Sequence, residues 1–288
     1  MKRILLSALG IAVVAAGAVF FTGCGKKGDG GEKRREITVI SREESSGTRG
    51  AFDELMNITD GKTNQLYPGA VIVSSTDEAA SKVEVDRFAI GYTSLGSVTS
   101  KVKALSIDGV APNEANVKNG SYKIARPFVL AEKSNAGQTI AADFKRFVVS
   151  KEGQEIVSKA GYITVDAGAP AYTAPSGLSG KLTLSGSTSV ERVVERLKEA
   201  YEKHNTNVKV EINYNGSSAG IRDCLSGRSD LAMSSRALKS DEKEQLTDKT
   251  FALDGIAIVV NQSNEKSNIT AEAVTRIFKG EVRFWNDL

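Results

Sequence analysis

The sequence predicts an α/β fold with mainly parallel sheets. Short apolar and β-branched runs alternate with amphipathic helical patterns along almost the whole 288-residue chain. Such alternation is typical of strands joined by crossover helices. The length suits one large domain or two lobes of ordinary size.

Turn residues separate the predicted strands. The strands cover Ile37–Ser41, Ala70–Ser74, Phe88–Thr93, Ile124–Glu132, Lys181–Leu184, Val208–Tyr214, Leu231–Ser234 and Ile256–Val260. Apolar residues recur at three- and four-residue steps in 139–149, 190–201 and 270–278, which indicates helices that bury one face. Thr270 is a suitable N-cap for the last of these helices.

The N-terminus has the pattern of an export signal. Lys2 and Arg3 precede the apolar run Ile4–Phe21, and the chain becomes polar directly after Cys24. The segment FTGC resembles a bacterial lipobox, so residues 1–23 are predicted to be a lipoprotein signal peptide and Cys24 its lipidation site. An uncleaved membrane anchor and an ordinary signal with an incidental cysteine are the alternatives. The prediction places the protein on the extracytoplasmic face of the cell membrane, anchored by lipid.

Two segments have the composition of connections. Residues 24–35 are dominated by glycine and charge, and they are predicted to be a flexible tether. Residues 166–180 are rich in Pro, Gly, Ala and Ser without an apolar period, and they are predicted to be a linker.

Composition excludes several classes of function. The formal charge is +3, and removal of residues 1–23 leaves +1, which is not the charge of a nucleic-acid binder. One histidine and two cysteines do not form a transition-metal cluster. No nucleotide fingerprint and no nucleophile with an adjacent base is visible. We therefore expect no metal, no cofactor and no catalytic residues.

Three turns of Gly, Ser and Thr each follow a predicted strand and open a helix. They are Ser45–Thr48, Gly186–Ser189 and Gly216–Gly220. A helix N-terminus offers free N–H groups and a partial positive charge, and glycine lets a ligand approach the backbone. Any one such turn is more often an ordinary N-cap that binds nothing. Arg42 precedes the first turn, and a guanidinium beside hydroxyls and amides suits phosphate or sulfate. An ordinary surface arginine is the alternative.

At these residues the sequence resembles the phosphate-binding proteins of bacterial high-affinity phosphate ABC transporters. The stretches that carry the resemblance are ITVISREESSGTRGAFDELM, FVVSKEGQEIVSKAGYI, GSTSVERVVERLKEAYEKHN, YNGSSAGIRDCLSGRSDLAMSSRALKSDE, DGIAIVVN and AEAVTRIFKGEVRFWNDL. They span most of the chain after the signal. The resemblance implies a two-lobed periplasmic-binding-protein-like fold with a hinge, a monomeric state, and permease subunits as partners.

The order of the stretches differs from the common family arrangement, in which GSTS comes first. We interpret this as a circular permutation, and a fragment of a tandem protein is the alternative. One lobe would then comprise residues 36–125 and 261–288, and the other residues 126–260 with the linker 166–180 inside it.

The resemblance implies a set of phosphate-binding residues: Arg42, Ser46, Gly47, Thr48, Thr188, Ser189, Ser217 and Ser235. Some family members have an aspartate where this chain has Ser235, and the aspartate accepts the proton of hydrogen phosphate. Discrimination against sulfate is therefore open. The implied function is capture of inorganic phosphate for an ABC importer; another oxyanion, a sensor role and phosphatase activity are the alternatives.

Overall fold

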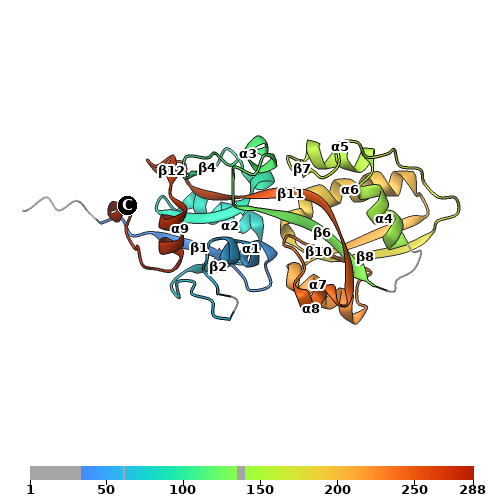
Figure 1. The fold of residues 1–288 in the computed structure, drawn as a ribbon, viewed down its shortest axis with the longest axis horizontal. Coiled ribbons are helices and arrows are strands. Elements are labelled where there is room, and N and C mark those ends of the chain that lie inside the picture. The colour runs from blue at the N-terminus through green and yellow to red at the C-terminus, as the bar shows by residue number, and fades with distance from the viewer. Residues whose placement is uncertain (1–33, 61, 135–139) are drawn as a thin grey trace, which may run out of the picture. The chain divides into compact units, whose positions relative to one another are not determined.

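The computed structural model describes residues 34–60, 62–134 and 140–288 (Figure 1). Its strands are β1 (Thr38–Arg42), β2 (Val71–Val73), β3 (Ala89–Ser94), β4 (Val102–Ala104), β5 (Ser106–Ile107), β6 (Ala125–Lys133), β7 (Ile163–Thr164), β8 (Gly180–Gly186), β9 (Val208–Tyr214), β10 (Leu231–Ser234), β11 (Leu246–Asn261) and β12 (Asn268–Ile269). The helices are α1 (Gly47–Leu55), α2 (Thr76–Val85), α3 (Glu114–Lys118), α4 (Ile140–Val148), α5 (Lys151–Lys159), α6 (Glu191–His204), α7 (Ser217–Ser226), α8 (Ser240–Lys243) and α9 (Ala271–Phe278). Three short 3-10 helices cover Leu95–Ser97, Thr188–Val190 and Trp285–Asp287.

The main sheet has the strand order β2-β1-β3-β11-β6-β10-β8-β9. Its two ends are parallel, since β2, β1 and β3 run together and so do β10, β8 and β9. The centre is antiparallel, from β3 through β11 and β6 to β10. The prediction of mainly parallel sheets therefore describes the ends of the sheet and misses the antiparallel centre, because the two long strands β6 and β11 were not expected to pair with each other.

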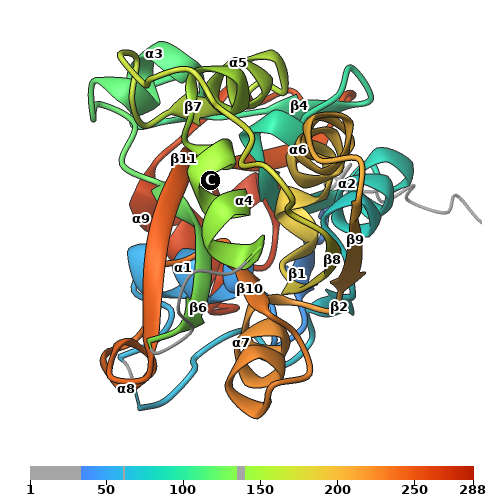
Figure 2. The ribbon, with the colours of Figure 1, turned by 90° about the vertical axis from the view of Figure 1, so that its right-hand side faces the viewer.

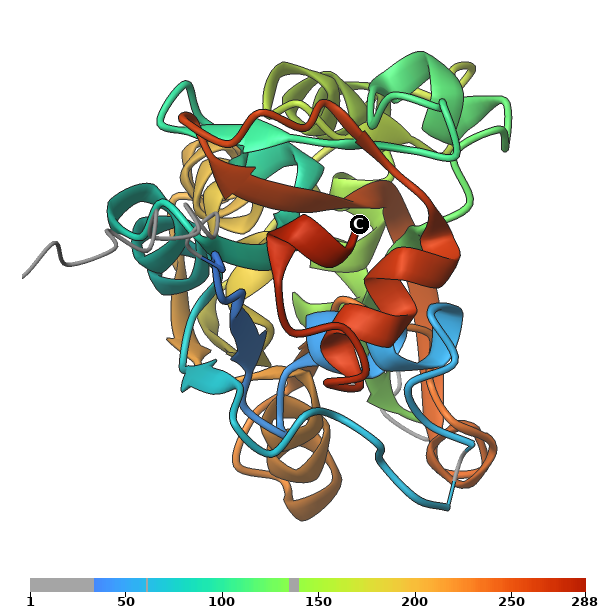
Figure 3. The same cartoon turned by 90° about the vertical axis from the view of Figure 1, so that its left-hand side faces the viewer.

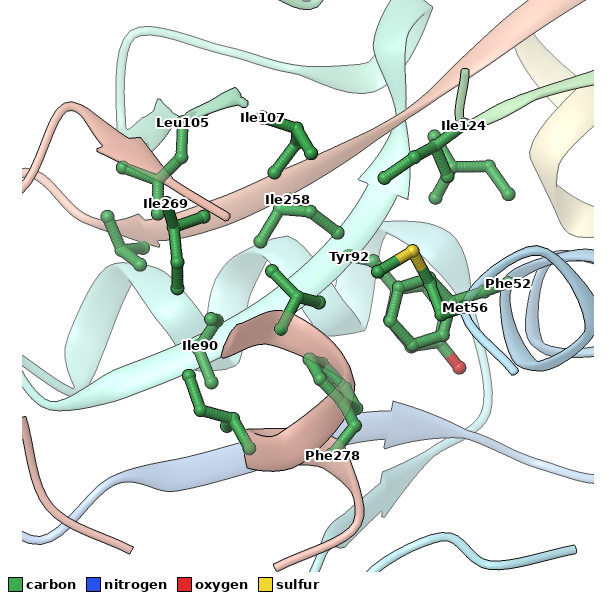
Figure 4. Packing of buried hydrophobic residues seen from close by; sticks show 14 of the residues in the cluster. Phe52, Met56, Ile90, Tyr92, Leu105, Ile107, Ile124, Ile258, Ile269 and Phe278 are labelled. Carbon is green, nitrogen blue, oxygen red and sulfur yellow. The ribbon is translucent and has the colours of Figure 1, made fainter. Parts of the chain in front are cut away.

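The buried side chains form two groups of clusters. The first group joins residues from β1, α1, β3 and the C-terminal helix α9, and Figure 4 shows part of its packing. Phe52 of α1 and Phe278 of α9 meet edge to face with centroids 4.7 Å apart, and Figure 3 shows the red α9 beside the blue α1. We call the part of the chain around these clusters the first lobe.

The second group of clusters lies among α4, α5, α6 and the strands β8, β9 and β10 (Figure 2), and we call this part the second lobe. Along β11 the buried side chains change from the second group to the first between Ala252 and Ile256. Strands β6 and β11 connect the lobes (Figure 1). The predicted lobe bounds, 36–125 with 261–288 and 126–260, stay predictions.

Most predicted elements agree with the structure to within two residues at each end. Val208–Tyr214 and Leu231–Ser234 have the predicted bounds, and Thr270 caps α9 by accepting from the amide of Ala273. Strand β11 is much longer than the predicted Ile256–Val260, because the polar and mostly exposed residues 247–250 interrupt the apolar pattern near its start.

The predicted linker has no helix or strand from 166 to 179, and β8 begins at Gly180. It is nevertheless attached to the second lobe. Tyr172 is buried, and its hydroxyl donates to Asp143 Oδ2 at 2.6 Å. The predicted signal peptide and Cys24 lie outside the described residues, as does almost all of the tether. Within the described ranges, no helix is long and apolar enough to cross a membrane.

Candidate functional site

The structure brings the three predicted turns together between the two lobes. The first turn opens α1, where Ser46 is the N-cap and accepts from the amide of Arg49 at 3.2 Å. The second opens the 3-10 helix that leads into α6, and the third opens α7. Gly216 precedes α7 with φ of 94°, a conformation that favours glycine. Each turn therefore presents a helix N-terminus at the junction of the lobes.

Hydroxyl groups of opposite lobes are in direct contact. Thr48 Oγ1 lies 2.6 Å from Ser189 Oγ. Thr76 Oγ1, at the start of α2, lies 3.0 Å from Ser189 Oγ and 3.3 Å from Thr188 Oγ1. Thr48, Thr76 and Ser189 are almost fully buried. We call this hydroxyl cluster, together with Arg42, Ser46, Gly47, Ser187, Ser217 and Ser235, the cradle.

Arg42 is the cation of the cradle. It ends β1 and is 2% exposed. Its Nη1 donates to Thr76 Oγ1 and its Nη2 to Thr188 Oγ1, both at 3.1 Å. Its Nε and Nη2 also donate to the carboxylate of Glu43 at 2.9 Å each. The guanidinium therefore contacts hydroxyls from both lobes and shares its charge with one carboxylate.

Gly47 allows the first and third turns to approach each other closely. A Cβ at this position would lie 2.2 Å from Ser217 Oγ and 2.7 Å from Ser235 Oγ. Ser217 Oγ accepts from the amide of Ser235 at 3.1 Å, and Ser235 Oγ accepts from Ser187 Oγ at 2.8 Å. Only glycine leaves room for these serines beside the start of α1.

All eight residues predicted to bind phosphate thus lie at one junction. Sequence reasoning missed two residues of the cradle, Thr76 and Ser187. Ser187 lies inside the GSTS turn itself, and Thr76 follows Ser74 and Ser75 where a strand passes into a helix. The turn before Thr76 therefore shares the hydroxyl residues and the strand-to-helix position of the other turns, but it contains no glycine.

The chemistry of the cradle is that of an anion receptor. Each hydroxyl both donates and accepts, and rotation about its C–O bond decides the direction of the proton. The hydroxyls that now bond one another can therefore turn their protons toward an anion placed among them. Burial removes competing water and strengthens such hydrogen bonds.

Two carboxylates close to cradle residues in sequence are already engaged. Glu43 pairs with Arg42. Asp230, which is close in sequence to Ser235, accepts from the amide and the hydroxyl of Thr183 at 2.7 Å each and is exposed. The described residues contain no group of three His, Cys, Asp or Glu side chains placed to hold a metal.

A cleft of about 1060 Å³ extends from the cradle. Ser46 and Ser218 line it beside the turns, and its walls carry charges of both signs, since Arg49, Arg126 and Arg236 are each paired with a carboxylate. Ser218 donates its amide to the carbonyl of Ser45 across the lobes at 3.0 Å. The cleft therefore approaches the cradle from the side on which the first and third turns meet.

Comparison with known proteins gives consistent matches. The family model of the PBP superfamily domain matches residues 26–152 and 166–288. The phosphate-binding protein PstS 2 of Streptococcus agalactiae is 40% identical over 293 residues, which cover 100% of this chain and 99% of that protein. PstS 2 of Streptococcus pneumoniae is 42% identical over 256 residues, which cover 88% of this chain and 87% of that protein.

One solved structure is also similar along most of its length. It is a phosphate-binding protein of a phosphate ABC transporter from Streptococcus pneumoniae, with 42% identity, a TM-score of 0.72, and coverage of 88% of this chain and 99% of that chain. The alignment with the S. agalactiae protein runs through both chains from end to end, so the two share the order in which SREESSGTR precedes GSTS.

Proposed function

Because the chain belongs to the PBP superfamily, whose model matches most of its residues, we propose that it is a solute-binding protein that captures inorganic phosphate between its lobes. Delivery to an ABC importer, with permease subunits as partners, is part of the proposal. The observation that carries it is the convergence of three helix N-termini, their hydroxyls and Arg42 on one buried point. The names of the streptococcal relatives support the choice of phosphate.

The proposed binding mode uses charge-assisted hydrogen bonds. Arg42 and the hydroxyls of Thr48, Thr188 and Ser189 would donate to the phosphate oxygens, as would groups of the first and third turns. Hydrogen bonds to charged groups contribute about 1.5–3 kcal/mol each. The sum of several such hydrogen bonds is larger than the binding free energy of a micromolar complex, which is about 8 kcal/mol. The difference offsets the unfavourable free energy of closing the lobes and ordering the site.

The location and assembly state are finer parts of the proposal. A lipid on Cys24 would hold the monomer at the extracytoplasmic face of the cell membrane, with residues 24–35 as the tether. We propose no enzymatic activity, since the relatives are named as binding proteins and the chemistry of the cradle requires no activated nucleophile.

A titration tests the ligand. The full chain, solubilised in detergent, is titrated with phosphate in a calorimeter, and saturable binding in the micromolar range is expected. Absence of saturable binding below millimolar phosphate contradicts the proposal. Hydrolysis of a phosphate ester by the same preparation would instead favour a phosphatase.

A sulfate-binding role is the second candidate, and Ser235 favours it. This side chain carries no charge that repels an unprotonated oxyanion, and its hydroxyl is held by Ser187 and Ser217. The same titration with sulfate decides between the two anions. Ser235→Asp is the matched variant: added negative charge at this position should weaken sulfate binding more than binding of hydrogen phosphate, which can donate its proton to the carboxylate.

A further inference from the structure

Tyr162 lies beside the cradle without belonging to any of its turns. It precedes β7 in the second lobe and is fully buried, and its ring lies 5.1 Å from that of Phe128 between centroids. Its hydroxyl donates to the backbone carbonyl of Ser189 at 3.2 Å. The phenol therefore holds the turn that supplies Thr188 and Ser189.

The same ring is pressed against the first lobe. A Cβ added to Gly96 would lie 2.5 Å from Cε1 and 2.6 Å from Cζ of Tyr162. Burial raises the pKa of the phenol to about 12, so the hydroxyl keeps its proton at neutral pH. Tyr162 is thus packed between a cradle turn of one lobe and a glycine of the other.

The contact between Tyr162 and Gly96 lies close to the strands that connect the lobes. Ser94 Oγ donates at 2.8 Å to Asp254 Oδ1 on β11, one of the two strands that connect the lobes. A contact close to connecting strands changes the angle between the lobes strongly for a small displacement. One methyl group at Gly96 would therefore force the lobes apart at a contact that adjoins Ser189 of the cradle.

We infer that Tyr162 and Gly96 form a closure contact that positions the cradle: the lobes reach ligand-binding geometry only when the ring seats on Gly96 and its hydroxyl holds Ser189. The inference rests on the proposed function, because it concerns closure around phosphate. Tyr162 is a positioning residue in this scheme, since it acts on the anion through Ser189. A bulkier residue at 96 limits closure, and loss of the hydroxyl loosens the turn.

Two variants test the contact in the full chain. Gly96→Ala should weaken phosphate binding at least tenfold, mainly through faster dissociation, because a Cβ at 2.5 Å from the ring is relieved only by partial opening. Tyr162→Phe keeps the ring and removes one hydrogen bond, so a loss of about threefold to tenfold is expected. Gly168→Ala is the matched control, since its Cβ would meet nothing closer than 3.6 Å.

A double variant separates positioning from general damage. In a Tyr162→Leu background the smaller side chain leaves space at Gly96, so adding Gly96→Ala should have little further effect on phosphate affinity. Small-angle scattering should show a smaller phosphate-induced decrease in radius of gyration for Gly96→Ala than for the unsubstituted chain. If Gly96→Ala does not fold, the dissociation rate of Tyr162→Phe decides the question.

The outcomes distinguish the inference from the proposed function. Phosphate binding by the unsubstituted chain together with unchanged affinity in both single variants overturns the closure contact and leaves the proposed function standing. An effect of Gly96→Ala that is equally large with and without the Tyr162→Leu substitution also overturns it. Absence of phosphate binding by the unsubstituted chain overturns both.

Discussion

Arg42 and Arg126 are both buried arginines paired with a carboxylate, but their surroundings differ. The side chain of Arg126 is 1% exposed and its partner Asp254 is 0% exposed. Asp254 also accepts from Ser94 Oγ and from the amide of Leu95 at 2.8 and 3.1 Å. Arg42 is equally buried, yet its partner Glu43 is 25% exposed, and its remaining side-chain partners include hydroxyls that can rotate.

The difference separates a structural ion pair from a receptor cation. Around Arg126 the carboxylate of Asp254 accepts from the guanidinium, the Ser94 hydroxyl and the Leu95 amide within the protein, and Nη1 of Arg126 is left without a hydrogen-bond partner among the described residues. Around Arg42 the donors and acceptors are interchangeable hydroxyls from two lobes, so an anion can replace part of the network without leaving a buried group unpaired. We expect substitutions at the first site to change the stability of the fold and substitutions at the second to change binding.

The largest effect is expected from Arg126→Met. It leaves the Asp254 carboxylate buried without its cation, and removing one partner of a buried pair costs about 3–5 kcal/mol. Urea unfolding of the ligand-free chain measures the loss. The double variant Arg126→Met/Asp254→Leu should recover much of it, because an apolar pair removes the buried charge. If the free energy of unfolding of Arg126→Met stays within 1 kcal/mol of that of the unsubstituted chain (about the scale of a single neutral hydrogen bond), the Arg126–Asp254 pair is not a structural ion pair.

Arg42→Met should weaken phosphate binding at least about 100-fold, which corresponds to the loss of one or two charge-assisted hydrogen bonds. Glu43 can be hydrated after the substitution because it is partly exposed, so stability should fall less than for Arg126→Met. Calorimetric titration measures the first quantity and urea unfolding the second. Retained micromolar affinity would show that the cradle binds without its cation.

Gly47→Ala changes the shape of the cradle without changing a charge. The added Cβ would overlap Ser217 Oγ, so the first and third turns must move apart. We expect a cost of about 1–3 kcal/mol, visible chiefly in phosphate affinity because the strain is relieved by opening the lobes. Gly168→Ala serves as the exposed control here too. If Gly47→Ala lowers the free energy of unfolding and leaves phosphate affinity unchanged, Gly47 has a structural role like that of Arg126 and Asp254.

The smallest effect concerns a third carboxylate, Asp223 of α7. A short hydrogen bond from Ser185, with further bonds from Arg228 and Asn215, lowers its pKa from 3.8 to about 2. A lowered folded pKa stabilises the fold above the unfolded value and loses that contribution as pH falls through about 2. We expect about 1 kcal/mol, since the partner Arg228 is largely exposed. Asp223→Asn should flatten stability between pH 5 and pH 2 (roughly the span over which such a group titrates).

The candidate site could be read largely from local patterns. Each turn was recognisable because glycines and hydroxyl residues follow a strand and open a helix, and the resemblance to a family supplied Ser235. Thr76 was missed since its turn, Ser74–Thr76, contains no glycine. The role of Tyr162 could not be predicted, because no residue pattern near it in the sequence indicates that its ring contacts Gly96 and its hydroxyl donates to Ser189.

Three features could be predicted from the sequence alone: the α/β alternation, the bounds of most strands and helices, and the residue types available to bind an oxyanion. These follow from periodicity and capping, which act over a few residues. The antiparallel pairing of β6 and β11 between the lobes, and the contact of Thr48 with Ser189 across 141 positions of the chain, became visible only in the folded structure. Such contacts depend on sheet register and lobe packing, to which residues far apart in the sequence contribute together.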